Sequence, residues 1–219
     1  MATRTVLKNE LMLSHWKRNS EDVLRMMKWS LRNPFPPVQE GGELKRRSYE
    51  RSKQQERLFG NDLIRVTRTD SSDNTGQWTT VAVESLVEFI LTGLYGKVWR
   101  PKYTCGHVGV RPDFETKMAI FEVKAQTWNG GGGTAGEKIF AVPWKYGELA
   151  QTLNKPVCII LVAAQEEEVR KKYGMFGGKL GKHHATSLRQ WEAQNIHFMP
   201  FSRLLKFYCK RKSINFKNI

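Results

Sequence analysis

The chain has no long hydrophobic run, since its most apolar stretch, residues 157–164, contains only eight residues. A helix that crosses a bilayer needs about 20, so no membrane span is expected. The N-terminal segment is interrupted by Arg4, Lys8, Asn9 and Glu10, which leaves no room for the apolar block of a signal peptide. We therefore expect an intracellular protein, cytoplasmic in a microbe or encoded by a virus.

Cysteine is also scarce. The three cysteines, Cys105, Cys158 and Cys209, are odd in number and widely spaced, and no pair has CxxC spacing. This pattern suits reduced thiols in a cytosol-like compartment. Cys105 and His107 lack the two further ligands that a structural zinc site requires, so neither a disulfide framework nor a zinc site is expected.

Acidic residues are few compared with basic ones. The 219 residues include 36 Lys and Arg against 21 Asp and Glu, which gives a net charge of +15. The excess lies at the two ends, with +6 over residues 1–60 and +8 over residues 166–219, while residues 61–165 carry only +1. This charge predicts a polyanionic partner or an acidic membrane surface.

No phosphate-binding loop of the P-loop type is present. The glycine-rich segments 130–136 and 177–182 resemble such loops in composition, but neither ends in the required Lys-Ser or Lys-Thr pair. Nucleotide hydrolysis is therefore excluded, and no nucleotide cofactor is expected.

Hydrophobic spacing and turn residues predict an α/β chain. Residues 1–60 are expected to form a helical region packed on the core, and residues 61–219 a second region with its core at about 80–200. The expected helices are 10–32, 43–59, 80–94, 143–153, 186–194 and two that begin at 166 and 202; the expected strands are 63–69, 108–113, 118–126, 157–164 and 196–200. Pro143 is placed at a helix start because proline suits the first helical position.

The pattern that carries chemistry is Pro112-Asp113 followed by Glu122 and Lys124. Side chains alternate along a strand, so Glu122 and Lys124 share one face. Burying both charges without partners would be costly, whereas metal-assisted phosphodiester hydrolysis gives them a role. Asp113 and Glu122 would bind Mg²⁺, which polarises a phosphate and lowers the pKa of a bound water. Lys124 would orient that water or stabilise developing charge.

This pattern resembles the motif of the PD-(D/E)XK nuclease superfamily. The order helix, strand, strand, strand, helix, strand over about residues 80–200 also resembles the core of that superfamily. The resemblance implies a restriction-endonuclease-like core, with a central mixed β-sheet flanked by helices, and Mg²⁺ as cofactor. It further implies a metal-binding glutamate on the helix before the first core strand. Glu84 has that place, and Glu88, one turn later, is the alternative.

Residues 121–139 resemble type II restriction endonucleases, some of which have a Gly/Thr-rich loop and a Glu-Lys pair after the catalytic strand. This resemblance implies a sequence-specific enzyme that cleaves double-stranded DNA as a homodimer. Residues 61–219 would then form the nuclease domain. The candidate DNA contacts come from the catalytic strand, the glycine-rich loop and the basic segment 170–184, and they are Gln126, Lys138, Lys179, Lys182 and His183.

Two other functions fit the same charge distribution: a structure-specific or repair nuclease of this superfamily, and a non-catalytic basic DNA-binding protein. Taken singly, Glu122 and Lys124 suit a solvated pair on an edge strand, and Glu84 suits the polar face of an ordinary helix. Only the nuclease functions account for Asp113, Glu122 and Lys124 together.

Overall fold

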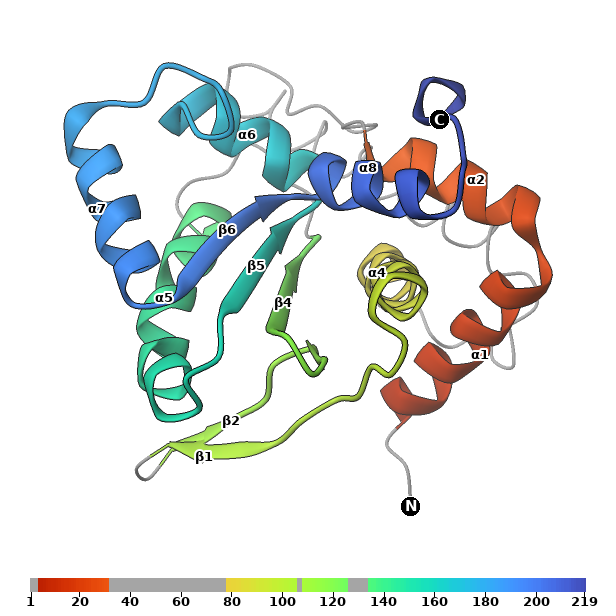
Figure 1. Cartoon of the computed structure of the whole chain (residues 1–219), viewed down its shortest axis with the longest axis horizontal. Helices are drawn as coiled ribbons and strands as arrows, with labels where there is room; N and C mark the ends of the chain where they lie inside the picture. Colours follow the sequence, from red (N-terminus) through yellow and green to blue (C-terminus); the bar gives the residue numbers. More distant parts are fainter. Residues whose placement is uncertain (1–3, 32–77, 106–107, 126–133) are drawn as a thin grey trace, which may run out of the picture.

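A mixed four-stranded sheet forms the centre of the molecule (Figure 1). The computed structural model describes residues 4–31, 78–105, 108–125 and 134–219, so the helix expected at 43–59 and the strand expected at 63–69 lie outside the described residues. The sheet order is β3 (Phe114–Glu115), β4 (Ile120–Lys124), β5 (Val157–Leu161) and β6 (Ile196–Pro200). β3 runs antiparallel to β4, and β4, β5 and β6 run parallel. The expected α/β fold with a mixed sheet flanked by helices is thus confirmed.

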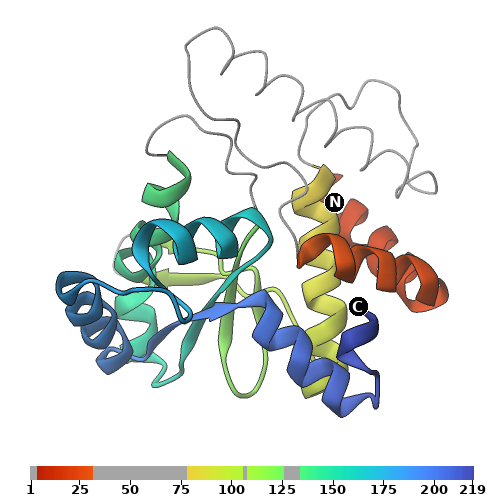
Figure 2. The same ribbon diagram turned by 90° about the horizontal axis from the view of Figure 1, so that it is seen from above.

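One face of the sheet is covered by α4 (Trp78–Tyr95), which packs between the sheet and the N-terminal helices α1 (Arg4–Arg18) and α2 (Ser20–Ser30) (Figure 2). α8 (Phe201–Arg211) lies beside α4 and leads to the short helix η2 (Phe216–Asn218). The buried side chains of this layer come from α1, α2, α4, α8 and one side of the strands, and they include Trp16, Leu86, Phe121, Val123 and Leu205.

The opposite face is covered by α5 (Thr134–Thr152), α6 (Ala164–Tyr173) and α7 (Lys182–Ala193), as both views show (Figures 1 and 2). All five residues of β5 are buried, as the continuous apolar run predicts for a strand covered on both sides. A separate hairpin of β1 (Tyr103–Cys105) and β2 (Val108–Val110) connects α4 with the sheet.

The expected helix over residues 10–32 is two helices. The backbone of Asn19 has φ −126° and ψ 82°, which lie outside the helical region, so the chain turns between α1 and α2. The break allows both helices to face α4: Trp16 donates from Nε1 to Ser85 Oγ at 3.0 Å, and Val23 and Met27 are buried in the same cluster.

The prediction that a helix begins at Pro143 is wrong. α5 begins nine residues earlier, at Thr134, and Pro143 lies in its interior. A proline there removes the N–H that would donate to Ile139. The helix continues because its buried face, which includes Ile139, Val142, Tyr146 and Leu149, keeps helical spacing through the proline.

The strand expected at 108–113 is shorter and pairs elsewhere. Only residues 108–110 form a strand, and β2 pairs with β1 instead of joining the central sheet. Asp113 lies at a bend directly before β3, because Pro112 has no N–H to continue a ladder. Glu115 belongs to β3, and residues 116–119 connect β3 to β4.

The helix expected at 186–194 begins earlier. Gly181 is extended, with φ −69° and ψ 152°, and α7 starts at Lys182, so that His183 and His184 lie in its first turn instead of in a loop. The side chains of His184, Leu188 and Trp191 then follow one helical face.

Ala163 has a strained backbone at the end of β5. Its φ of +49° and ψ of −115° place it at the second position of a turn, which the hydrogen bond from Gln165 N to Val162 O closes at 3.0 Å. This is type II′ geometry, which favours glycine. The Ala163 N–H donates to the carbonyl of Ser30 at 3.1 Å, so this strained turn also attaches α2 to the end of the sheet.

We expect the substitution Ala163→Gly to raise the free energy of unfolding by about 1 kcal/mol. The relief of backbone strain, about 1–3 kcal/mol, exceeds the loss of one buried methyl group, about 0.8 kcal/mol. Ala164→Gly, at the start of α6, is the matched control. It loses a buried methyl group without relief of strain and should lower the free energy of unfolding by about 1–2 kcal/mol. Urea unfolding measures both variants, and a less stable Ala163→Gly protein would contradict this account.

Candidate active site

The three residues of the sequence motif lie together at the β3–β4 edge of the sheet. Along β4, Phe121 and Val123 enter the core beside α4, while Ile120 enters the core beside α5. Glu122 and Lys124 therefore face the α5 side, as the alternation of a strand predicts. Glu122 is buried, with 5% of its surface exposed, so it is not a solvated pair partner on an open surface.

Asp113 is held by the backbone of the motif itself. Its Oδ2 accepts a hydrogen bond from the N–H of Val123 at 2.6 Å. β3 has only two residues and pairs with Ile120 and Phe121, so no strand of the ladder reaches Val123 on this side. The carboxylate of Asp113 takes the place of the missing strand, which brings it beside the residue that separates Glu122 from Lys124.

The carboxylate of Glu122 has a partner at each oxygen. Oε1 accepts from Lys124 Nζ at 2.6 Å, and Oε2 accepts from the hydroxyl of Tyr146 at 2.7 Å. Tyr146 comes from the buried face of α5, and its hydroxyl lies 3.3 Å from the carbonyl of Arg111. Burial, followed by the charge of Glu122, raises the pKa of Tyr146 above its ordinary value, so the phenol stays a hydrogen-bond donor.

Tyr146 is a site residue that sequence analysis missed. It lies 24 positions after Glu122, in a stretch that the sequence places on an ordinary apolar helix face. The available signal is its place in the buried face of α5, because a buried tyrosine hydroxyl requires a polar partner.

Glu84 and Glu88 of α4 share the guanidinium of Arg100, another residue that sequence analysis missed. Arg100 lies 2.8 Å from Glu88 and 3.8 Å from Glu84. Burial raises the pKa of Glu84; the positive charge of Arg100 opposes this rise, and the carboxylate of Glu122 adds to it. Glu84 therefore lies within the electric field of the β4 motif, whereas Glu88 is the closer partner of Arg100.

Three carboxyl groups repel one another at this site. Burial, followed by the negative charges of Glu122 and Glu84, raises the pKa of Asp113 to about 8, although the Val123 N–H and the charge of Lys124 oppose the rise. At neutral pH the Asp113 carboxyl holds a proton more tightly than an exposed aspartate does. A cation placed among these groups would reverse that preference.

The donors suit a hard divalent cation, since carboxylate oxygens are the ligands that Mg²⁺ prefers. Their present spacing is not that of a bound ion: within the described ranges, no group of three or more His, Cys, Asp or Glu side chains is close enough to hold a metal. Each oxygen of Glu122 already accepts one hydrogen bond, from Lys124 or from Tyr146, and each keeps a second lone pair for a metal.

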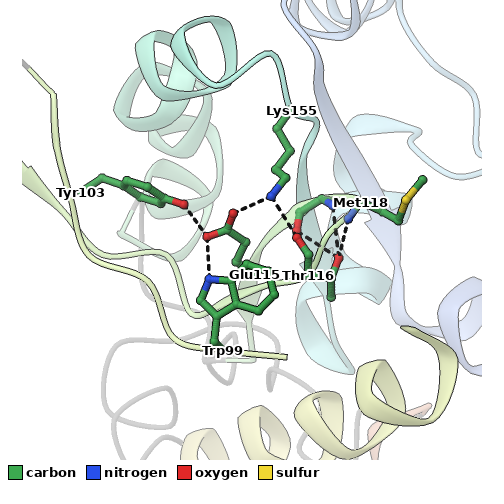
Figure 3. A network of polar contacts seen from close by, with 7 residues as sticks. Trp99, Tyr103, Glu115, Thr116, Met118 and Lys155 are labelled. Atoms are coloured by element: carbon green, nitrogen blue, oxygen red, sulfur yellow. Dashed lines mark hydrogen bonds and ion pairs between the residues drawn. The ribbon is translucent and has the colours of Figure 1, made fainter. Parts of the chain in front are cut away.

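A second buried carboxylate nearby has a different role (Figure 3). Glu115 accepts from Lys155 Nζ at 2.5 Å, from Trp99 Nε1 at 2.9 Å and from the hydroxyl of Tyr103. Although burial acts in the opposite direction, these hydrogen bonds lower the pKa of Glu115. Lys155 also donates to the carbonyl of Thr116 at 2.9 Å, so this network joins β1, β3 and the segment before β5.

The residues predicted to contact DNA come from different parts of the chain. Gln126 is outside the described residues. Lys138 is on α5, Lys179 precedes α7, and Lys182 and His183 are in the first turn of α7, all exposed. α7 packs beside β6, two strands away from β4 in the sheet, so Lys182 and His183 lie away from the carboxylates.

No protein-family model, curated protein or solved structure matches the chain. In the part of the chain that the structure describes, no helix has both the length and the apolarity needed to cross a bilayer. Any functional conclusion therefore depends on the chemistry and geometry of the site.

We expect Asp113→Asn to remove a pH-dependent loss of stability. The pKa of Asp113 is about 8 in the folded chain and about 4 when unfolded. The folded state therefore binds the proton more tightly, and the free energy of unfolding falls as pH rises from 4 to 8. The asparagine keeps an acceptor for the Val123 N–H but has no carboxyl group to ionise.

Urea unfolding in EDTA at pH 5 and pH 8.5 measures this effect. From pH 5 to pH 8.5, the free energy of unfolding of wild type should fall by at least about 1 kcal/mol more than that of Asp113→Asn. Glu167→Gln on the outside of α6 should behave as wild type. Parallel pH profiles for wild type and Asp113→Asn would contradict the assignment.

Proposed function

We propose that the chain is a Mg²⁺-dependent endonuclease of the PD-(D/E)XK superfamily. It hydrolyses phosphodiester bonds of double-stranded DNA at specific sequences, as type II restriction enzymes do. The observation that carries the proposal is the hydrogen bond from Val123 N–H to Asp113 Oδ2. This bond brings the aspartate, from a separate segment of the chain, next to the pair of Glu122 and Lys124, and the charges of that pair also act on Glu84 of α4.

Tyr146, Lys124 and Arg100 orient the carboxylates of this site. Tyr146 and Lys124 fix the orientation of the Glu122 carboxylate from two sides. Arg100 binds Glu88 at 2.8 Å and Glu84 at 3.8 Å, so it holds Glu84 less tightly. When a phosphate enters, the Lys124 ammonium stabilises the charge that develops on it.

Asp113, Glu122 and Glu84 would hold the Mg²⁺ ion. In this position the metal would polarise the phosphate and lower the pKa of a bound water. Burial and the charges of Glu122 and Glu84 raise the pKa of Asp113. The repulsive part of this rise supports the role, since a divalent cation favours the ionised carboxyl groups that otherwise repel one another.

The basic residues supply affinity for the DNA backbone. Lys179 and Lys182 before and at the start of α7, and Lys210 and Arg211 in the last turn of α8, are all exposed. Such contacts give salt-dependent binding without sequence preference. A homodimer is the corresponding quaternary structure, because two-fold symmetry matches a palindromic site.

We expect plasmid DNA incubated with the purified protein to yield discrete fragments with Mg²⁺ and none with EDTA. Agarose gel electrophoresis of the products is the measurement. A smear or nicked circles would favour the structure-specific or repair nuclease. Retardation of the plasmid without cleavage in Mg²⁺ would overturn both enzyme functions and favour the DNA-binding protein.

Single substitutions in the motif should abolish cleavage without abolishing DNA binding. We expect Asp113→Asn, Glu122→Gln and Lys124→Ala each to lower the cleavage rate at least about 100-fold. Glu167→Gln, an isosteric change on the exposed side of α6, is the control and should leave the rate unchanged. Gel retardation in EDTA checks binding, and full cleavage by any of the three motif variants would show that the site is elsewhere.

The same assay decides between the two glutamates of α4. Glu84→Gln should lower the rate more than Glu88→Gln, because the field of Glu122 and Lys124 acts on Glu84. The reverse order would transfer the metal-binding role to Glu88.

A further inference from the structure

α7 is a helix without a buried residue. None of its 12 residues is fully covered, although its helical face of His184, Leu188 and Trp191 is directed toward the rest of the protein. Leu188 and Trp191 are half-buried, and His184 is exposed. An amphipathic helix normally covers its apolar face against the core, so this face has room for an additional group.

That room is a pocket of about 290 Å³ between α5, the end of α6 and α7. Its size is at the lower end of the pockets that hold small ligands, and it would admit one ring system. Its walls are largely aromatic or apolar: Phe140, Tyr173, Met175, Leu188 and Trp191, with His184 at the side. The aromatic rings support one another, since the centroids of Phe140 and Tyr173 lie 4.8 Å apart, edge to face, and those of Phe140 and Trp191 lie 6.1 Å apart.

The segment between α6 and α7 holds the pocket wall in place. Gly174 has φ +71°, and a Cβ atom there would lie 2.1 Å from the carbonyl oxygen of Lys179. The backbone therefore packs against itself, and Met175 next to Gly174 is buried with 3% exposure. The pocket is thus built on a segment whose close packing only glycine permits.

Two exposed lysines lie close in the sequence to the pocket, because Lys182 directly precedes His183, which lines it. Lys179 precedes α7, Lys182 is its first residue and His183 is its second, and all three are exposed. The four N-terminal N–H groups of an α-helix also favour an anion at this end. An apolar, ring-lined cavity with cations nearby is complementary to a nucleotide, which has a flat aromatic base attached to an anionic phosphate.

We propose that the aromatic pocket binds one unpaired base of a nucleic acid strand, with the adjacent phosphates on Lys179 and Lys182. This assignment rests on the proposed action on DNA and adds to it that the bound substrate has a base outside the duplex stack. Removing a base from the stack costs a few kcal/mol, and stacking in an aromatic pocket offsets about 1–3 kcal/mol of it.

α5 connects the aromatic pocket with the candidate active site. Phe140 lines the pocket and Tyr146 binds Glu122, and both are on this helix. Six residues separate them, which corresponds to roughly 9 Å along the helix axis. The pocket and the Glu122 carboxylate therefore both lie on the α5 side of the sheet.

The test compares two fluorescent 10-nucleotide strands in EDTA by fluorescence anisotropy. One strand is abasic throughout, and the other carries a single thymine at its centre, so that both have the same phosphates. We expect the strand with the base to bind at least about 5-fold more tightly. Trp191→Leu should remove this difference without changing the affinity for the abasic strand, because leucine retains apolar packing but offers no ring.

Two further variants separate stacking from charge. Trp144→Leu removes a tryptophan that is 94% exposed on α5 and should change neither affinity. Lys182→Gln should weaken both strands equally and reduce the dependence of log K on log salt by about 0.7. A retained preference for the base in Trp191→Leu would contradict the pocket assignment.

Equal affinity of wild type for the two strands would overturn the proposal. A dimer in sedimentation that Trp191→Leu dissociates, with DNA binding unchanged, would instead assign the aromatic pocket to a second copy of the chain. These outcomes are independent of catalysis. A protein that prefers the strand with the base but does not cleave plasmid DNA would refute only the proposed enzymatic function. A protein that cleaves plasmid DNA but binds both strands equally would refute only the pocket assignment.

Discussion

The hydrogen bond between the Val123 N–H and the Asp113 carboxylate holds the site together. It ends the pairing of β4 where the two-residue strand β3 stops, and it fixes an acidic group at the same point. Without it, a backbone donor at the sheet edge would lack its partner, and a buried carboxylate would lack the N–H that offsets part of its desolvation. Fold and site therefore depend on one contact: the side chain that completes the sheet also belongs to the carboxylate cluster.

Two buried glutamates on adjacent strands show how environment separates structural from chemical roles. Glu115 has three donors, among them the ammonium of Lys155, and its pKa is lowered, so it remains ionised and fixed. Around Glu122 the acids outnumber the bases, and burial together with the charges of Glu122 and Glu84 raises the pKa of Asp113. A satisfied carboxylate stabilises the fold, whereas a cluster with excess negative charge is unstable until a cation or a proton enters it.

Sequence periodicity located most of the sheet but not the contacts between segments. β5 lies in the continuous apolar run that predicts it, β6 lies over the expected residues 196–200, and the alternation of β4 correctly places Glu122 and Lys124 on one face. The start of α5 is predicted nine residues too late, because proline favours the first position of a helix, whereas Pro143 lies inside α5. Partners from distant segments, such as Tyr146 and Arg100, have no signal in local spacing, because tertiary packing alone brings them to the site. The location of Gln126 and of the expected strand over residues 63–69 stays a prediction.

The helical geometry of α5 fixes how the side chain of Phe140, in the aromatic pocket, is oriented relative to that of Tyr146, beside Glu122. Each residue of an α-helix turns the chain by about 100° and advances it by about 1.5 Å, and only six steps separate Phe140 from Tyr146. An insertion or deletion within these steps would rotate one ring out of its place while the other kept its contact. The number of residues between Phe140 and Tyr146 is therefore fixed by the two contacts together. A substitution at either residue changes one contact alone, whereas an insertion or deletion between them prevents both contacts from forming at once.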